Sequence, residues 1–158
     1  KELPVLQENG IRLHAIGNLD ALPSKARRQL DATREATAGN ERMVLTLALS
    51  YGSRQEILGA VKDLARRSAN GEIQPEGITE ADIAQALWTH DLPDPELVIR
   101  TSGEQRISNF LLWQISYAEF VFLPVLWPDF SKEDLVEALE QYAGRERRLG
   151  KTSEQLTA

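Results

Sequence analysis

The most constraining feature of the sequence is a nearly continuous apolar run, Met43-Val-Leu-Thr-Leu-Ala-Leu49. An apolar run of strand length, without alternating polar residues, is typical of a strand that is covered on both faces in a parallel sheet. Further strands are predicted at Ile11–Ile16, which ends at Gly17-Asn18, and at 97–99 and 120–122. We expect the 43–49 run to be the central strand of one mostly parallel sheet.

Helical patterns separate these strands. Residues 108–117 are apolar almost all round, which is typical of a buried helix, and Ser108 is at the position of its N-cap. Three residue pairs have capping-box spacing, namely Ser53 with Glu56, Thr79 with Asp82 and Ser131 with Asp134. A further helix is predicted at about 23–38. Strands that alternate with helices predict an α/β fold, with a mostly parallel sheet flanked by helices.

Some apolar side chains are predicted to be buried. The stripe Leu135, Leu139 and Tyr142 is expected to face inward on the last helix, because its spacing follows one helical face. The aromatic residues expected in the core are Trp113, Tyr117 and Trp127.

Composition excludes several classes of protein. The 158 residues contain no Cys, which excludes a disulfide framework and thiol chemistry, and carry a net charge of −6, which argues against a broad nucleic-acid or anionic-lipid surface. No apolar run reaches the length of about 18 residues that a membrane span needs. A chain of this length can form its own core, so we expect a single domain over residues 1–158.

The segment Arg100 to Ser108 is the candidate ligand site. It follows a predicted strand, and ligands of open α/β sheets bind beyond the carboxyl ends of strands. Arg100 and Arg106, with Gly103 for close backbone approach and a helix N-terminus at Ser108, would form a receptor for a diphosphate. The alternative is that both arginines pair with Glu104 or Asp94 and only fix the turn, and the pattern alone favours neither reading.

The other charged residues have simpler explanations. Glu119 lies between two apolar segments, where a charge needs a cation, and a structural ion pair is the simpler reading. Arg145, Arg147 and Arg148 are explained by the dipole at a helix C-terminus. His14 and His90 lack a spaced partner, so a structural role is favoured over metal binding for both.

The chain resembles the cis-prenyltransferases, typified by undecaprenyl diphosphate synthase. The resemblance is carried by Ile99-Arg-Thr-Ser-Gly-Glu-Gln-Arg-Ile-Ser-Asn-Phe-Leu-Leu-Trp-Gln114, Tyr117-Ala-Glu119 and Leu126-Trp-Pro-Asp-Phe130. Weaker matches at Gly10–Gly17, Tyr51–Arg54 and Arg145–Gly150 extend it over nearly the whole chain. It implies the α/β fold of undecaprenyl diphosphate synthase, of which these residues would be the C-terminal portion.

The resemblance implies an enzyme that condenses isopentenyl diphosphate onto an allylic diphosphate, such as farnesyl diphosphate, to give a long polyprenyl diphosphate. It implies that Arg100, Arg106, Ile107 and Ser108 bind the diphosphate of isopentenyl diphosphate. It further implies that Glu119 helps to bind Mg²⁺. In the homodimer of the family, Arg148 and Gly150 would contact the diphosphate of the neighbouring subunit. The expected location is cytoplasmic, with peripheral membrane contact through the lipid product.

The chain departs from the family pattern at several points. The family often has Asn before a Tyr-Gly-Gly-Arg motif, and this chain has Ser50 in place of that Asn and Ser53 in place of the second Gly. Gln105 stands where many members have His. The family's Asp-Gly-Asn-Gly-Arg-Trp phosphate loop and its Ser-Ser-Glu-Asn-Trp segment have no match in this chain. The catalytic residues are therefore expected upstream of Lys1, and residues 1–158 alone are expected to be inactive. The alternatives are a non-catalytic partner subunit of a cis-prenyltransferase and an unrelated phosphosugar or nucleotide binder.

Overall fold

The computed structural model describes residues 2–145, in two compact units that meet in the sequence at Leu92–Pro93. The first unit contains α1 (Leu3–Glu8), β1 (Ile11–Ile16), α2 (Ser24–Ala36), β2 (Met43–Ala48), α3 (Ser53–Ala69) and α4 (Glu80–Ala86), with short 3-10 turns at Leu19–Ala21 and Pro75–Gly77. The second unit contains β3 (Leu97–Arg100), β4 (Glu119–Phe122), a 3-10 turn at Trp127–Asp129 and α5 (Lys132–Ala143). A single domain over residues 1–158 stays a prediction.

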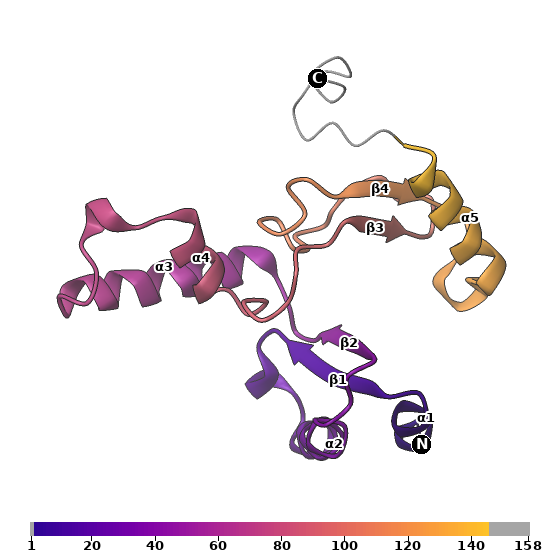
Figure 1. Ribbon diagram of the computed structural model, residues 1–158, viewed down its shortest axis with the longest axis horizontal. Helices are drawn as coiled ribbons and strands as arrows, with labels where there is room; N and C mark the ends of the chain where they lie inside the picture. Colours follow the sequence, from indigo (N-terminus) through magenta and orange to yellow (C-terminus); the bar gives the residue numbers. More distant parts are fainter. Residues whose placement is uncertain (1, 146–158) are drawn as a thin grey trace. The chain divides into compact units, whose positions relative to one another are not determined.

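Parallel strand pairing is confirmed in both units (Figure 1). β1 pairs with β2 from Ile11 opposite Met43 to Ile16 opposite Ala48, and β3 pairs with β4 from Leu97 opposite Glu119 to Arg100 opposite Phe122. The described residues therefore form two two-stranded parallel sheets with helices beside them, which is the predicted α/β class.

The β1–β2 sheet is fixed to α2 by side-chain hydrogen bonds. Thr37, the C-cap residue that follows α2, is fully buried, and its Oγ1 accepts a hydrogen bond from the backbone N–H of Leu13 at 3.0 Å. The Asn40 amide donates to the backbone oxygen of Ile11 at 2.8 Å. These bonds satisfy backbone groups on one side of β1, while β2 covers the other.

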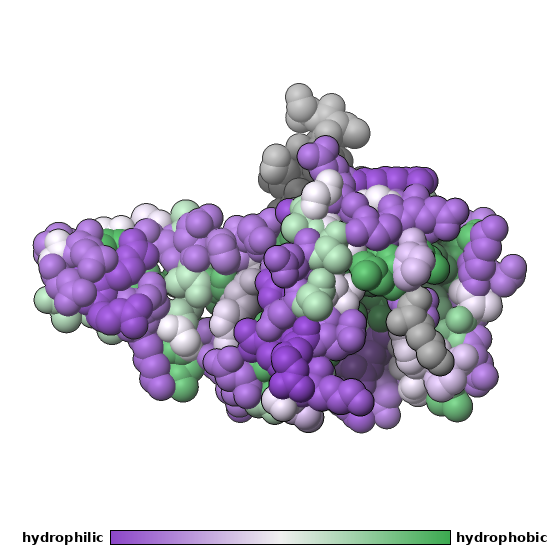
Figure 2. Space-filling view, turned by 90° about the horizontal axis from the view of Figure 1, so that it is seen from below, coloured by the Kyte–Doolittle hydropathy of each residue, from purple (hydrophilic) through white to green (hydrophobic). Residues whose placement is uncertain are grey.

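The prediction that the 43–49 run is covered on both faces is wrong for the described residues. Alternate residues of a strand point to opposite faces, and Met43 and Val44, which are consecutive, are 49% and 39% exposed. In residues 2–145, β2 pairs with β1 alone, and Leu45 and Leu47 are also 38% and 37% exposed, so neither face is fully covered. Figure 2 shows hydrophobic residues that reach the surface of the molecule.

The predicted helix at 108–117 is also wrong. Ser108, Asn109 and Leu111 have φ values of 50°, 61° and 47°, so the backbone is left-handed where a helix would begin, and the segment forms successive turns. A helix that is apolar all round must be covered on all sides, and the described part of the second unit offers only two strands and α5. Ser108 is therefore not a helix N-cap.

Two of the three predicted capping boxes are present in the structure. The capping boxes at Thr79 with Asp82 and Ser131 with Asp134 are confirmed, and the hydrogen bonds from Ser131 lower the pKa of Asp134. The box at Ser53 with Glu56 is wrong, because Gly52 is the N-cap of α3 and makes no side-chain capping bond.

The predicted inward stripe of the last helix is wrong as well. Leu135 and Leu139 are 40% and 46% exposed, whereas Ala138 is fully buried against Val121 and Leu123. Alanine at this position lets the helix approach the β3–β4 sheet closely, and the larger side chains flank the contact. Tyr117 and Trp127 are 77% and 72% exposed, so their assignment to the core is also wrong.

Candidate functional site

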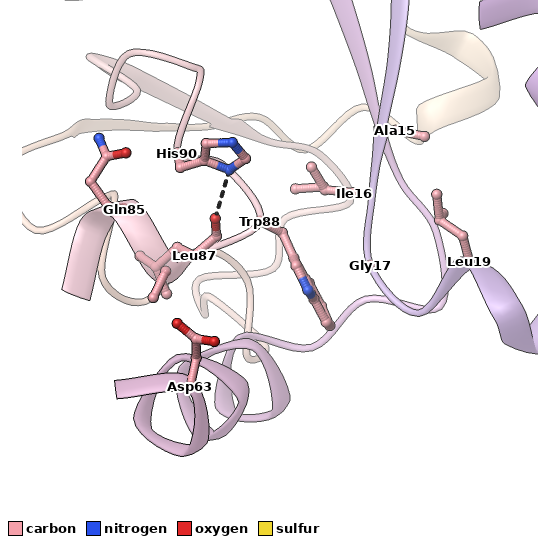
Figure 3. Close-up of a pocket in the computed structure, with 10 residues that line it drawn as sticks. Ala15, Ile16, Gly17, Leu19, Asp63, Gln85, Leu87, Trp88 and His90 are labelled. Carbon is pink, nitrogen blue, oxygen red and sulfur yellow. Dashed lines mark hydrogen bonds between the residues drawn. The ribbon is translucent and has the colours of Figure 1, made fainter. Parts of the chain in front are cut away.

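A pocket of about 400 Å³ lies at the carboxyl end of β1 (Figure 3). Ile16 and Gly17 line it from β1 and the turn after it, Asp63 from α3, and Trp88 and His90 from the turn after α4. The His90 imidazole Nδ1 lies 3.1 Å from the backbone oxygen of Leu87. The walls are mainly apolar, and their polar side chains include the Asp63 carboxylate, the Gln85 amide and the His90 imidazole. Sequence reasoning missed this pocket, because its residues come from elements far apart in the chain.

A buried carboxylate fixes the turn that carries Trp88. Glu56 on α3 is 1% exposed, and it accepts a hydrogen bond from the Tyr51 hydroxyl and one from the backbone N–H of Trp88 at 2.9 Å. The Tyr51 and Trp88 rings meet edge to face at 5.8 Å. Glu56 therefore joins the loop after β2, the first turn of α3 and the 88–90 turn. The sequence pattern instead predicted that Glu56 forms a capping box with Ser53.

His14 lies beside a second pocket, of about 430 Å³, which Arg12 and Arg34 also line. Its Nε2 is 3.8 Å from a carboxylate oxygen of Asp91. Burial lowers the pKa of His14, Asp91 partly offsets that effect, and the nearby arginines add to it. Within residues 2–145 there is no group of three or more His, Asp or Glu side chains that could hold a metal ion.

The candidate diphosphate segment follows β3 in the second unit, as predicted. The backbone N–H groups of Ser102 and Gly103 donate to the oxygens of Val125 and Leu123, at 2.7 and 2.9 Å, so both amides already have partners. Gly103 has a φ of +65°, and a Cβ there would meet no atom within 4 Å. Its glycine thus serves the left-handed turn, and the described structure shows no close approach that requires it.

The two arginines of this segment differ in their surroundings. Arg106 forms an ion pair with Glu104 and its side chain is 66% exposed, which is the pairing that the alternative reading predicted. Arg100, the last residue of β3, forms no ion pair with any residue in the range 2–145. Ile107 and Ser108 are exposed beside Arg106. Within residues 2–145, one cation of the predicted receptor therefore has no ion pair with a carboxylate, the other has an exposed ion pair, and the predicted helix N-terminus is absent.

Glu119 lies at the other end of the same pair of strands. It is the first residue of β4, opposite Leu97, whereas Arg100 is opposite Phe122, three residues or about 10 Å along the strands. The structure does not bring Glu119 and Arg100 together. Glu119 forms an ion pair with Arg145 at 2.8 Å, as the simpler reading predicted. Arg147, Arg148 and Gly150 lie outside the described residues.

No helix within the described range 2–145 is long and apolar enough to cross a membrane.

The comparisons with known proteins agree on one family. The family model described as "Putative undecaprenyl diphosphate synthase" matches residues 1–150. An isoprenyl transferase of Heliobacterium mobile is 49% identical over 150 residues, which are 95% of this chain and 58% of that protein.

A second curated relative is more specifically described. It is the ditrans,polycis-undecaprenyl-diphosphate synthase ((2E,6E)-farnesyl-diphosphate specific) of Vibrio vulnificus strain YJ016, 45% identical over 157 residues, which are 99% of this chain and 62% of that protein. The chain thus spans about three fifths of the length of these curated relatives.

A solved structure extends the similarity to the fold. The crystal structure of lavandulyl diphosphate synthase from Lavandula x intermedia, in complex with dimethylallyl diphosphate, matches with a TM-score of 0.91 and 36% sequence identity. The match covers 94% of this chain and 64% of that one. The chain therefore belongs to the undecaprenyl diphosphate synthase family of cis-prenyltransferases.

Proposed function

We propose that the intact protein containing this chain condenses isopentenyl diphosphate onto an allylic diphosphate and makes a long-chain polyprenyl diphosphate. Farnesyl diphosphate is the proposed primer and undecaprenyl diphosphate the proposed product. The proposal is supported by membership of the family and by the 45% identity to a farnesyl-diphosphate-specific synthase of Vibrio vulnificus. The observation that carries it is a pair of arginines at the carboxyl end of β3, Arg100 as its last residue and Arg106 in the segment that follows, which resembles the family most closely.

Arg100, Arg106, Ile107 and Ser108 are proposed to hold the diphosphate of isopentenyl diphosphate. Arg100 has no carboxylate partner in the range 2–145, so no carboxylate of this range competes with an incoming diphosphate for it. The Arg106–Glu104 pair is exposed and stabilises the protein by no more than about 1 kcal/mol, so a charge-assisted contact to diphosphate can replace it. The Ser108 hydroxyl adds a neutral hydrogen-bond donor.

Glu119 is proposed to help bind Mg²⁺. Mg²⁺ in proteins commonly uses one or two carboxylates, with substrate phosphates and water as the remaining ligands, so a single partly exposed carboxylate fits its requirements. When bound, the ion would neutralise charge on the leaving diphosphate.

The residues of this chain act in the reaction by binding and orientation. The allylic C–O bond breaks, the alkene of isopentenyl diphosphate attacks the allylic carbon, and a proton is lost. Arginines that hold one diphosphate fix the alkene next to the allylic carbon, which converts a two-body encounter into a reaction within one complex.

A homodimer is the proposed assembly, with Arg148 and Gly150 contacting the diphosphate of the neighbouring subunit. It is supported by the large apolar side chains exposed in the second unit, among them Tyr117, Leu126 and Trp127. Interfaces are enriched in aromatic side chains of this kind. A cytoplasmic location, with peripheral membrane contact through the lipid product, is part of the same proposal.

Residues 1–158 alone are proposed to lack transferase activity and to aggregate. This is supported by the exposed apolar faces of β2 and by the absence from the sequence of the family's Asp-Gly-Asn-Gly-Arg-Trp loop. The same absence favours the second candidate function, a non-catalytic subunit that supports a catalytic chain.

Arg106→Ala in the intact protein is expected to lower kcat/KM for isopentenyl diphosphate about ten- to a hundredfold, because it removes a charge-assisted contact that contributes roughly 1.5–3 kcal/mol. Steady-state kinetics with labelled isopentenyl diphosphate measures the change. Arg66→Ala is the control, because Arg66 is an exposed arginine that forms an ion pair with Asp63 on the same helix. An Arg106→Ala protein with normal efficiency would refute the assignment of this residue.

A further inference from the structure

The Glu119 carboxylate is already engaged by a cation from its own chain. Its Oε2 accepts a hydrogen bond from Nη1 of Arg145 at 2.8 Å, and the two side chains are 32% and 36% exposed. The Glu119 backbone N–H donates to the oxygen of Glu96, which holds the residue at the start of β4. The carboxylate is thus in a fixed place, partly shielded from solvent, with one of its oxygens occupied.

Arg145 is held in place by the end of α5. The helix ends at Ala143, and the Arg145 N–H donates to the backbone oxygen of Tyr142 at 3.2 Å. The Tyr142 hydroxyl donates to Glu96 Oε2 at 2.6 Å. Two side-chain contacts therefore tie the end of α5 to residues that begin the two paired strands, and Arg145 supplies the only ion pair of Glu119 within residues 2–145.

An ion pair with Arg145 neutralises part of the negative charge of the Glu119 carboxylate, which makes this carboxylate a weaker ligand for Mg²⁺. A divalent cation near Glu119 is also repelled by the guanidinium. We propose that Arg145 is a positioning residue that competes with a divalent cation for Glu119, so that Arg145 lowers the metal affinity of this carboxylate while keeping it ordered in the absence of metal. The inference rests on the metal-binding role proposed for Glu119.

The test is the affinity of the intact protein for Mn²⁺ alone, measured by electron paramagnetic resonance of the free ion. Arg145→Gln is expected to tighten Mn²⁺ binding about thirtyfold, the factor that corresponds to the repulsion between a divalent ion and one unit charge about 4 Å apart in water. Arg145→Lys keeps the charge and is expected to bind Mn²⁺ close to the wild-type affinity. Arg66→Gln, which breaks an exposed ion pair with Asp63, is the matched control and is expected to have no effect.

Variants of Glu119 separate the two proposals. Glu119→Gln is expected to weaken Mn²⁺ binding, and Arg145→Gln is expected to have no further effect in that background. If Glu119→Gln leaves Mn²⁺ affinity unchanged, the metal role of Glu119 is wrong and this inference is overturned with it. If Glu119→Gln weakens Mn²⁺ binding but Arg145→Gln does not tighten it, only the role of Arg145 is overturned. The same holds if Arg145→Gln tightens Mn²⁺ binding equally in the Glu119→Gln background. A merely structural role of Arg145 predicts weaker binding on its removal, so the direction of the change decides.

Discussion

Replacement of Glu56 with alanine is expected to lower the free energy of unfolding by about 3 kcal/mol or more, because it removes a buried hydrogen-bonding group from two partners. The backbone N–H of Trp88 and the hydroxyl of Tyr51 would lose their bonds to the carboxylate, and the side chain is 1% exposed, so water would not replace it freely. Urea denaturation of the intact protein, followed by circular dichroism, measures the loss.

Two variants make this result specific. Glu56→Gln keeps an oxygen that can accept the Trp88 N–H and is expected to destabilise less than the alanine variant. Glu140→Ala removes an exposed glutamate from α5 and is expected to change stability by no more than about 0.5 kcal/mol. Equal stabilities of Glu56→Ala and Glu140→Ala would contradict the role given to Glu56.

Gly17→Ala is expected to destabilise the protein by about 3 kcal/mol or more. Gly17 has a φ of +111°, and a Cβ at this position would lie 2.0 Å from the backbone oxygen of Leu49. The two loops that leave β1 and β2 run side by side here, since the Leu49 N–H donates to Ile16 and the Asn18 N–H to Ser50. An added methyl group must push these backbones apart, which breaks hydrogen bonds in addition to straining the φ angle.

Gly59→Ala is the matched control for this prediction. Gly59 is exposed in the interior of α3, and a Cβ there meets no atom within 4 Å. Alanine is favoured over glycine in a helix by about 1 kcal/mol, so this variant is expected to stabilise the protein. The two glycine variants should therefore shift the apparent Tm in opposite directions, and a Gly17→Ala protein with a normal Tm would contradict the close approach of the loops.

The parts of the fold that could be predicted from the sequence depend on local patterns. The strand at Ile11–Ile16 and the capping boxes of α4 and α5 are determined by residues within a few positions of one another, and each is confirmed. The burial of β2 could not be predicted in this way. Its apolar pattern indicates the environment that the strand needs, whereas its exposure depends on which elements cover it.

Non-local contacts explain the other failures. The 108–117 segment has the composition of a buried helix, yet left-handed residues at its start and the few elements around it give turns instead. Glu56 has the spacing of a cap residue, but its partner Trp88 lies 32 residues away, and no local pattern signals that bond. For the candidate site, the sequence predicts that a positively charged segment follows a strand. It does not predict which of the two arginines forms an ion pair with Glu104.

The most direct test of the proposed prenyl transfer is a product assay. The intact protein is incubated with farnesyl diphosphate, labelled isopentenyl diphosphate and Mg²⁺, and the label in long-chain products is counted for the wild type and for an Arg100→Ala/Arg106→Ala double variant. We expect the wild type to incorporate label into polyprenyl diphosphate and the double variant, folded to the same extent, to lose nearly all of this activity. No incorporation by the folded wild-type protein, or equal incorporation by the double variant, would contradict the proposal.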